Sequence, residues 1–77
     1  MRLAFVSPLP PAATGIADYA ADVVALLAGR HAIDLFHDQE DVDRSRLPAG
    51  CDVRRAAELL ERHRQRPYDL VVHQLGK

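Results

Sequence analysis

The sequence predicts an α/β fold, a Rossmann-like parallel sheet with flanking helices. Two apolar runs without polar alternation, residues 3–6 (LAFV) and 70–72 (LVV), are typical of strands that are covered on both faces. The first run leads through a proline-rich crossing into an amphipathic segment, which is the order of a strand, a loop and a crossover helix. Strands joined in this way are expected to be parallel.

The composition describes a globular chain of at most one domain. It has 77 residues, and 10 basic and 11 acidic side chains leave a net charge of -1, which argues against a nucleic-acid partner. No apolar run is long enough to span a bilayer, and we interpret the chain as cytoplasmic. Cys51 is the single cysteine, so no intrachain disulfide or cysteine-based metal cluster is expected.

The small size of the chain sets a further expectation. In a chain of 77 residues, the stabilisation from apolar burial and the cost of ordering the backbone are of similar magnitude. Because the sequence offers neither a disulfide nor an evident metal site, we expect the chain to be part of something larger.

The first strand and helix should be joined by a stiff loop. Prolines at positions 8, 10 and 11 prevent residues 7–13 from continuing a strand. Either Thr14 or Gly15 can cap the helix expected at residues 16–28, and Asp18 complements its dipole. Helical spacing predicts an inner face made of Ile16, Tyr19, Ala20, Val23, Leu26 and Leu27.

The remaining elements follow in alternation. A second strand is expected at residues 33–36, then a polar surface loop over residues 37–50 with room for one helical turn, then a short edge strand at 51–53. A second helix is expected at residues 55–66, before the buried strand at 70–72. Its predicted inner stripe consists of Ala56, Leu59, Leu60 and His63.

A candidate site follows from the topology. In open parallel sheets, ligands bind outside the carboxyl ends of the strands, at the point where the crossovers go to opposite faces. A strand order of 3-2-1-4 would place the segments after residues 3–6 and 70–72 at that point. The free N–H groups and positive dipole of a helix N-terminus suit an anion such as phosphate. This geometry selects Thr14, Gly15, Ile16, Gln74 and Gly76.

Several motifs have structural interpretations. Gly15 is the single glycine of the first turn, so the dinucleotide fingerprint GxGxxG is absent, and Gly76-Lys77 does not complete a P-loop. The four histidines show no metal-ligand spacing and are interpreted as surface or helix-end residues, His73 being of interest because it ends a strand. Tyr19 is interpreted as a core aromatic, and Asp18 as either a dipole complement or a site residue.

Three sequence blocks carry a resemblance to a known family. Residues 1–11 (MRLAFVSPLPP), 14–19 (TGIADY) and 68–76 (YDLVVHQLG) resemble the N-terminal start of bacterial family 4 glycosyltransferases (GT4). Those enzymes have the GT-B architecture, in which two Rossmann-like domains enclose the active site. The family commonly has asparagine where this chain has Lys77.

The resemblance implies that residues 1–77 form an incomplete N-terminal, acceptor-side half-domain, with the C-terminal nucleotide-sugar domain missing and no transferase activity expected of this part alone. The whole enzyme would transfer a sugar from a nucleotide-sugar donor to a hydroxyl acceptor. No catalytic residue, metal or cofactor is assigned here. The resemblance places the donor diphosphate at Thr14, Gly15 and Ile16. It places the acceptor near Asp18, Tyr19, His73, Gln74 and Gly76.

Two alternatives remain open. One is a small non-catalytic α/β ligand-binding or interaction module. The other is a flavodoxin-like phosphate-binding protein, which would use the same helix terminus without sugar chemistry.

Overall fold

The protein is built around one sheet of four parallel strands in the order β3-β2-β1-β4. The computed structural model describes residues 1–12 and 15–74. Its strands are β1 (Arg2–Val6), β2 (Ala32–His37), β3 (Asp52–Arg55) and β4 (Leu70–His73). The parallel sheet confirms the expectation from the sequence, and the strand order is the one under which the exits of β1 and β4 meet at one edge.

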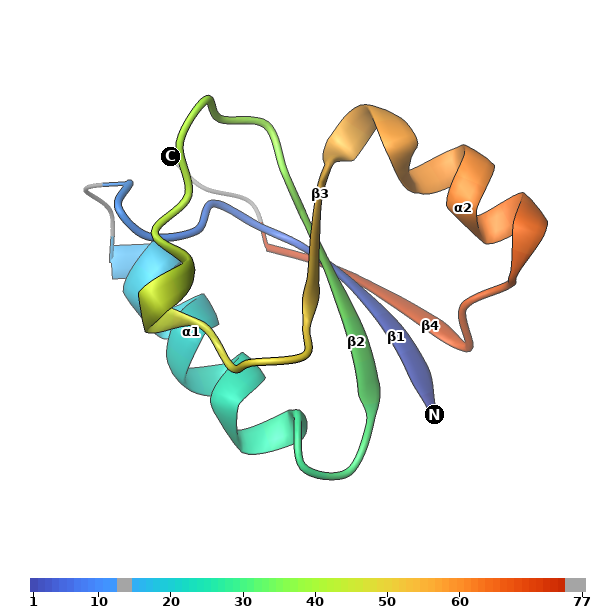
Figure 1. Ribbon diagram of the computed structural model, residues 1–77, viewed down its shortest axis with the longest axis horizontal. Helices are drawn as coiled ribbons and strands as arrows, with labels where there is room; N and C mark the ends of the chain where they lie inside the picture. The colour runs from blue at the N-terminus through green and yellow to red at the C-terminus, as the bar shows by residue number, and fades with distance from the viewer. Residues whose placement is uncertain (13–14, 75–77) are drawn as a thin grey trace.

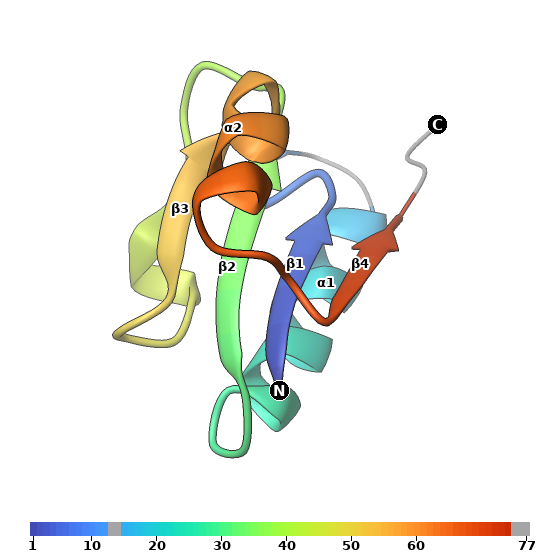
Figure 2. The ribbon, with the colours of Figure 1, turned by 90° about the vertical axis from the view of Figure 1, so that its right-hand side faces the viewer.

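Helices lie on both faces of this sheet. Figure 1 shows the sheet nearly edge-on, with α1 (Gly15–Leu27) on one side and α2 (Leu59–Gln65) on the other. A 3-10 turn, η2 (Ala56–Glu58), leads directly into α2, and η1 (Arg44–Arg46) provides the short turn expected in the polar loop. Figure 2 views the same sheet from the α2 side, with α1 behind it.

The main apolar core lies between the sheet and α1. It includes Leu3 and Phe5 from β1, and Leu9 from the proline loop lies completely buried in it. The buried residues of α1 are Ala17, Ala20, Ala21 and Val24. The predicted inner face was therefore wrong in part: Tyr19 is 59% and Leu26 82% exposed. Small side chains face the sheet because they let the helix lie close to it, and hydrophobicity alone pointed to the larger ones.

The face under α2 has a much smaller core. Ala4, Phe36 and Tyr68 are its buried apolar residues, with Val6 and Leu59 packed beside them. No residue of α2 is fully buried, and Leu60 is 62% exposed, so the predicted inner stripe of this helix was also wrong in part. Polar contacts hold much of this layer together instead.

Strand β4 is an exposed edge strand, and its prediction as a buried strand was wrong. Leu70 is 49% and Val71 37% exposed. An apolar run without alternation predicts a strand that is covered on both faces. Within the described residues β4 pairs with β1 alone, and the helices on either side leave its apolar side chains partly uncovered.

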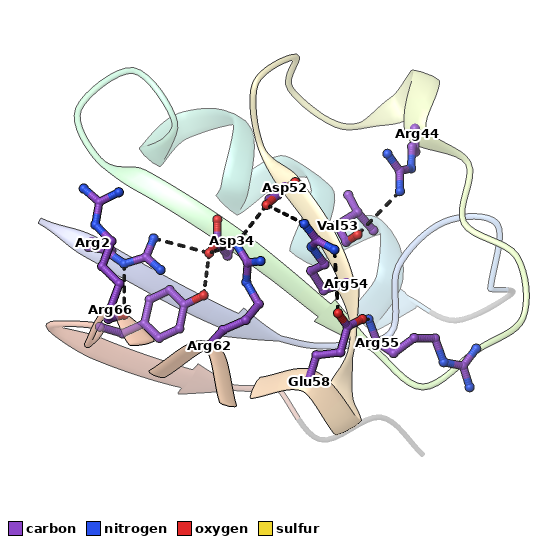
Figure 3. A network of polar contacts seen from close by, with 11 residues as sticks. Arg2, Asp34, Arg44, Asp52, Val53, Arg54, Arg55, Glu58, Arg62 and Arg66 are labelled. Carbon is purple, nitrogen blue, oxygen red and sulfur yellow. Dashed lines mark hydrogen bonds and ion pairs between the residues drawn. The ribbon is translucent and has the colours of Figure 1, made fainter. Parts of the chain in front are cut away.

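A buried carboxylate replaces apolar packing under α2. Asp34 of β2 is 8% exposed, and its Oδ2 atom lies 3.3 Å from Arg2 Nη1 and 3.3 Å from Arg62 Nη2 (Figure 3). The Tyr68 hydroxyl also donates a hydrogen bond to this oxygen. Burial and this carboxylate raise the pKa of Tyr68, which keeps its hydroxyl protonated as a donor. Arg62 additionally reaches Asp52 Oδ2 at 2.9 Å, and so ties α2 to β2 and β3.

Replacing Asp34 by alanine should destabilise the fold by about 2–4 kcal/mol, because Arg2, Arg62 and Tyr68 would lose a shared buried acceptor. Urea unfolding followed by circular dichroism measures this change. The matched control is Asp22→Ala on the exposed side of α1, which should change stability by less than about 0.5 kcal/mol. An equal effect of both substitutions would contradict a structural role for the Asp34 network.

Candidate functional site

The chain exits of β1 and β4 lie together at the carboxyl edge of the sheet. Val6 is the register partner of His73, and the Gln74 amide donates to the Val6 carbonyl at 2.8 Å. On the other side, the Ser7 amide donates to the Phe36 carbonyl at 3.0 Å. Because α1 and α2 cover opposite faces, the crossover direction changes between β1 and β4. This is the position at which open parallel sheets bind ligands.

A hollow of about 330 Å³ occupies this edge. It is open to solvent and takes residues from the ends of three strands and from the start of η2. Its lining consists of Val6, Ser7, Pro8, His37, Asp38, Gln39, Ala56, His73 and Gln74. We call this hollow the carboxyl-edge crevice.

Gln39 holds the wall of the crevice in place. Its side-chain oxygen accepts a hydrogen bond from the Leu9 amide at 3.1 Å, and its side-chain nitrogen donates to the Leu9 carbonyl at 2.8 Å. The pair of bonds satisfies both backbone groups of Leu9, which is fully buried. The Asp43 amide donates to the Pro10 carbonyl at 2.7 Å. The proline loop is therefore fixed by contacts as well as by its prolines.

His37 is a buried titratable group in the crevice. It ends β2, is 8% exposed, and its Nδ1 atom accepts a hydrogen bond from the Gln39 amide at 3.2 Å. An acceptor at Nδ1 places the proton of the neutral imidazole on Nε2. Burial first, and the nearby Arg55 guanidinium second, lower the pKa of His37. His37 is therefore a neutral imidazole at neutral pH.

The rest of the rim is polar and mostly exposed. Arg55 donates to the Gln39 carbonyl at 2.8 Å and lies 3.7 Å from Asp38 Oδ1. His73 and Gln74 add an imidazole and an amide from the β4 side. Imidazole, amide and carboxylate groups together offer both donors and acceptors, a combination that suits a hydroxyl-bearing ligand.

The residues selected from the sequence fall into three groups. Gln74, which the topology selected, and His73, which the resemblance placed near the acceptor, both line the crevice. Gly15 and Ile16 begin α1, and neither is a lining residue of the crevice. Asp18 and Tyr19 do not line the crevice either. The Asp18 carboxylate pairs instead with Arg46 at 2.7 Å. Thr14 and Gly76 lie outside the described residues.

His37, Asp38 and Gln39 line the crevice but were not among the residues selected from the sequence, which placed all three in a polar surface loop. The histidine spacing indicates a surface or helix-end residue at position 37, and the structure corrects this, because the His37 side chain is buried in the crevice. The available signal was its position: it directly follows the apolar residues 33–36, so it had to leave the sheet at the same edge as Ser7 and Gln74.

Within residues 1–12 and 15–74, no three histidine, cysteine or acidic side chains come close enough to hold a metal ion. In the same part of the chain, neither helix has the length and apolarity needed to cross a membrane. In comparisons with known proteins, no protein-family model, no curated protein and no solved structure matches this chain.

Replacing Gln39 by alanine should destabilise the fold by about 1–3 kcal/mol, because it leaves the buried amide of Leu9 unpaired, whereas the Leu9 carbonyl keeps the hydrogen bond that it accepts from the Ala12 amide at 3.0 Å. Urea unfolding gives the magnitude, and faster hydrogen exchange of the Leu9 amide reports the loosened loop. Gln39→Glu is the matched control, because it keeps the side-chain acceptor for the Leu9 amide and loses the side-chain donor. Its stability should lie between that of the original protein and that of Gln39→Ala. Unchanged exchange at Leu9 in the alanine variant would contradict this role of Gln39.

The stability of the protein should decrease as pH falls below about 6.5, because the lowered pKa of His37 means that the unfolded chain takes up the proton first. The contribution of neutral His37 to the free energy of unfolding is complete above the ordinary histidine pKa. It is lost as the pH falls through the lowered pKa of His37 in the folded protein. Unfolding curves between about pH 5 and pH 8, compared with those of His37→Asn, measure the contribution. Identical pH dependence of the two proteins would contradict the burial effect.

Proposed function

We propose that the chain is the acceptor-side, N-terminal part of a family 4 glycosyltransferase of GT-B architecture, which transfers a sugar from a nucleotide-sugar donor to a hydroxyl acceptor. The observation that carries the proposal is the carboxyl-edge crevice, where the exits of β1 and β4 meet. Five of its nine lining residues lie in the sequence blocks that resemble this family: Val6, Ser7 and Pro8 in residues 1–11, and His73 and Gln74 in residues 68–76.

The chemistry of the crevice supports a hydroxyl-bearing ligand on this side. His37, held neutral with its proton on Nε2, supplies a hydrogen-bond donor without a charge, and Gln74 supplies both a donor and an acceptor. Asp38 supplies an acceptor at the rim. These groups can position an acceptor hydroxyl, whereas the donor sugar and its nucleotide would be bound by the second domain of the proposed enzyme.

The start of α1 is the proposed contact for the donor diphosphate. Gly15 is exposed, and a Cβ built on it would meet no atom within 4 Å, so a ligand has room to approach the backbone there. Backbone N–H groups at a helix N-terminus, together with the helix dipole, favour a bound anion. In a transferase the same groups would stabilise the leaving diphosphate.

A second candidate function is a small ligand-binding module without catalysis. The observation in its favour is that this chain alone supplies the lining of the crevice, so binding there needs no second domain. The two candidates differ in the coding sequence that they require beyond residue 77, because only the transferase needs one that continues into a second Rossmann-like domain.

Binding of simple probes to the chain tests the proposal. A methyl hexoside should shift the NMR signals of His37, His73 and Gln74, and inorganic pyrophosphate should shift those of Gly15 and Ile16. Ala25, on the exposed side of α1, serves as an internal reference that should not move. Absence of both sets of shifts would contradict the proposal, and flavin binding in their place would favour a flavodoxin-like protein.

Gly15→Val should weaken pyrophosphate binding about tenfold, because a branched side chain shields one or two amide contacts. The substitution should leave the fold intact, since the space around Gly15 is open. Gly29→Val is the matched control: it lies beyond the other end of the same helix, and a Cβ there also meets no atom within 4 Å. Isothermal titration measures both affinities, and an unchanged affinity for Gly15→Val would count against the diphosphate assignment.

A further inference from the structure

The backbone of Gln39 is held by two side chains that lie next to each other. Its amide donates to His37 Nδ1 at 3.2 Å, and its carbonyl accepts a hydrogen bond from Arg55 Nη1 at 2.8 Å. His37 and Arg55 are register partners at the point where β2 and β3 end. One of the two side chains is a permanent cation and the other takes up a proton in mild acid. The charge on His37 therefore acts on both contacts of Gln39.

The hydrogen bond between the Gln39 amide and His37 exists only while His37 is neutral. A neutral imidazole with its proton on Nε2 offers Nδ1 as an acceptor, whereas an imidazolium carries a proton on each nitrogen and accepts no hydrogen bond. The Gln39 amide is itself a donor. Protonation of His37 sets these two donors against each other, so this hydrogen bond breaks.

The hydrogen bond between Arg55 and the Gln39 carbonyl is weakened by the same proton. Protonated His37 and the Arg55 guanidinium would be like charges at paired positions of β2 and β3, and such charges repel. The His37 side chain is buried, so solvent screens this repulsion less than it screens a fully exposed pair. Asp38 Oδ1 lies 3.7 Å from Arg55 Nη2 and offers the guanidinium a partner other than Gln39.

Charged or titratable groups approach the end of β2 from several elements. They are Arg55 of β3, Arg44 of η1, the neighbouring Asp38, and His73 of β4 on the far side of the crevice. Glu58 of η2 accepts a hydrogen bond from the Arg55 amide. Burial first, and Arg55 second, outweigh the Gln39 backbone and Asp38, which act in the opposite direction, so the pKa of His37 lies below its ordinary value of 6.5.

Gln39 connects this charge to the proline loop. Its side-chain oxygen accepts from the Leu9 amide at 3.1 Å, and its side-chain nitrogen donates to the Leu9 carbonyl at 2.8 Å. The Leu9 carbonyl also accepts from the Ala12 amide at 3.0 Å, so it has a second partner. The Leu9 amide depends on Gln39 instead, and Leu9 is fully buried. The Leu9 amide is therefore the group that reports whether Gln39 stays in place.

We propose that His37 is a proton-sensitive switch, which fixes residues 8–12 of the proline loop to the end of β2 when it is neutral and releases them when it is protonated. Pro8 and Gln39 both line the carboxyl-edge crevice, so release loosens one of its walls. The sheet stays paired, because the Ser7 amide donates to the Phe36 carbonyl without involving Gln39. The switch concerns this chain by itself and does not rest on the proposed function.

An NMR titration of the chain between about pH 5 and pH 8 tests the switch. The nitrogen chemical shifts of the His37 ring should show an unprotonated Nδ1 at high pH and a pKa below 6.5. Through the same transition the Gln39 amide signal should move, and the protection of the Leu9 amide against hydrogen exchange should fall at least about fivefold. The Ser7 amide, at the start of the same loop, is the internal reference that should keep its protection.

Two substitutions isolate the imidazole. In His37→Asn the side-chain oxygen takes the place of Nδ1 and accepts from Gln39 at every pH, so the protection of the Leu9 amide should stay constant. His73→Asn is the matched control, because it removes the other histidine of the crevice and should leave the transition unchanged. Arg55→Gln removes the neighbouring charge and should move the transition to higher pH. Circular dichroism confirms that each variant is folded.

Three results would overturn the proposal. One is a Leu9 amide whose protection does not follow the protonation of His37 in the unmodified chain. Another is a transition that persists in His37→Asn or disappears in His73→Asn. The third is a loss of protection at Leu9 that the amides of Phe5 and Leu35 share, because the whole core and not the loop would then open. None of these measurements uses a sugar or a nucleotide, so their failure is separate from that of the proposed function.

Discussion

The structure depends on the pairing of β1 with a parallel neighbour on each side. Parallel strands need crossover connections, and those connections are right-handed, so the crossover from β1 to β2 and the return from β3 to β4 run over opposite faces. The exits of β1 and β4 must then meet at one edge, where Val6 lies beside His73. The crevice is a consequence of this chain topology, before any side chain in it is considered.

The two faces of the sheet are packed by different kinds of contact. Under α1, apolar side chains from the sheet, the helix and the proline loop form the main core. Under α2, the Asp34 carboxylate accepts hydrogen bonds from Arg2, Arg62 and Tyr68. At the start of η2, the Glu58 side chain accepts a hydrogen bond from the Arg55 amide. Polar contacts position α2 without covering it, which is why an apolar groove remains open beside β4.

Periodicity was sufficient to predict the element order, the parallel sheet and the meeting of the two strand exits. It failed where packing decides between neighbouring residues. Hydrophobicity favoured Tyr19 and Leu26 for the inner face of α1, whereas close approach of the helix selects alanines. It could not show that Asp34 is buried, because its partners lie 28 to 34 residues away in the sequence. It missed His37 for a related reason: only tertiary contacts bury this side chain.

Gln39 fixes the wall of the carboxyl-edge crevice on the side formed by β1, β2 and β3. Its amide donates to His37, its carbonyl accepts from Arg55, and its side chain holds both backbone groups of Leu9. One residue thus joins the exits of β1, β2 and β3 into a wall that is organised before a ligand arrives. On the other side of the crevice lie His73 of β4 and Gln74 after it, and within residues 1–12 and 15–74 strand β4 pairs with β1 alone. The geometry of the crevice therefore depends on two independent contacts: the pairing of Val6 with His73 on one side, and the bonds of Gln39 to Leu9 on the other.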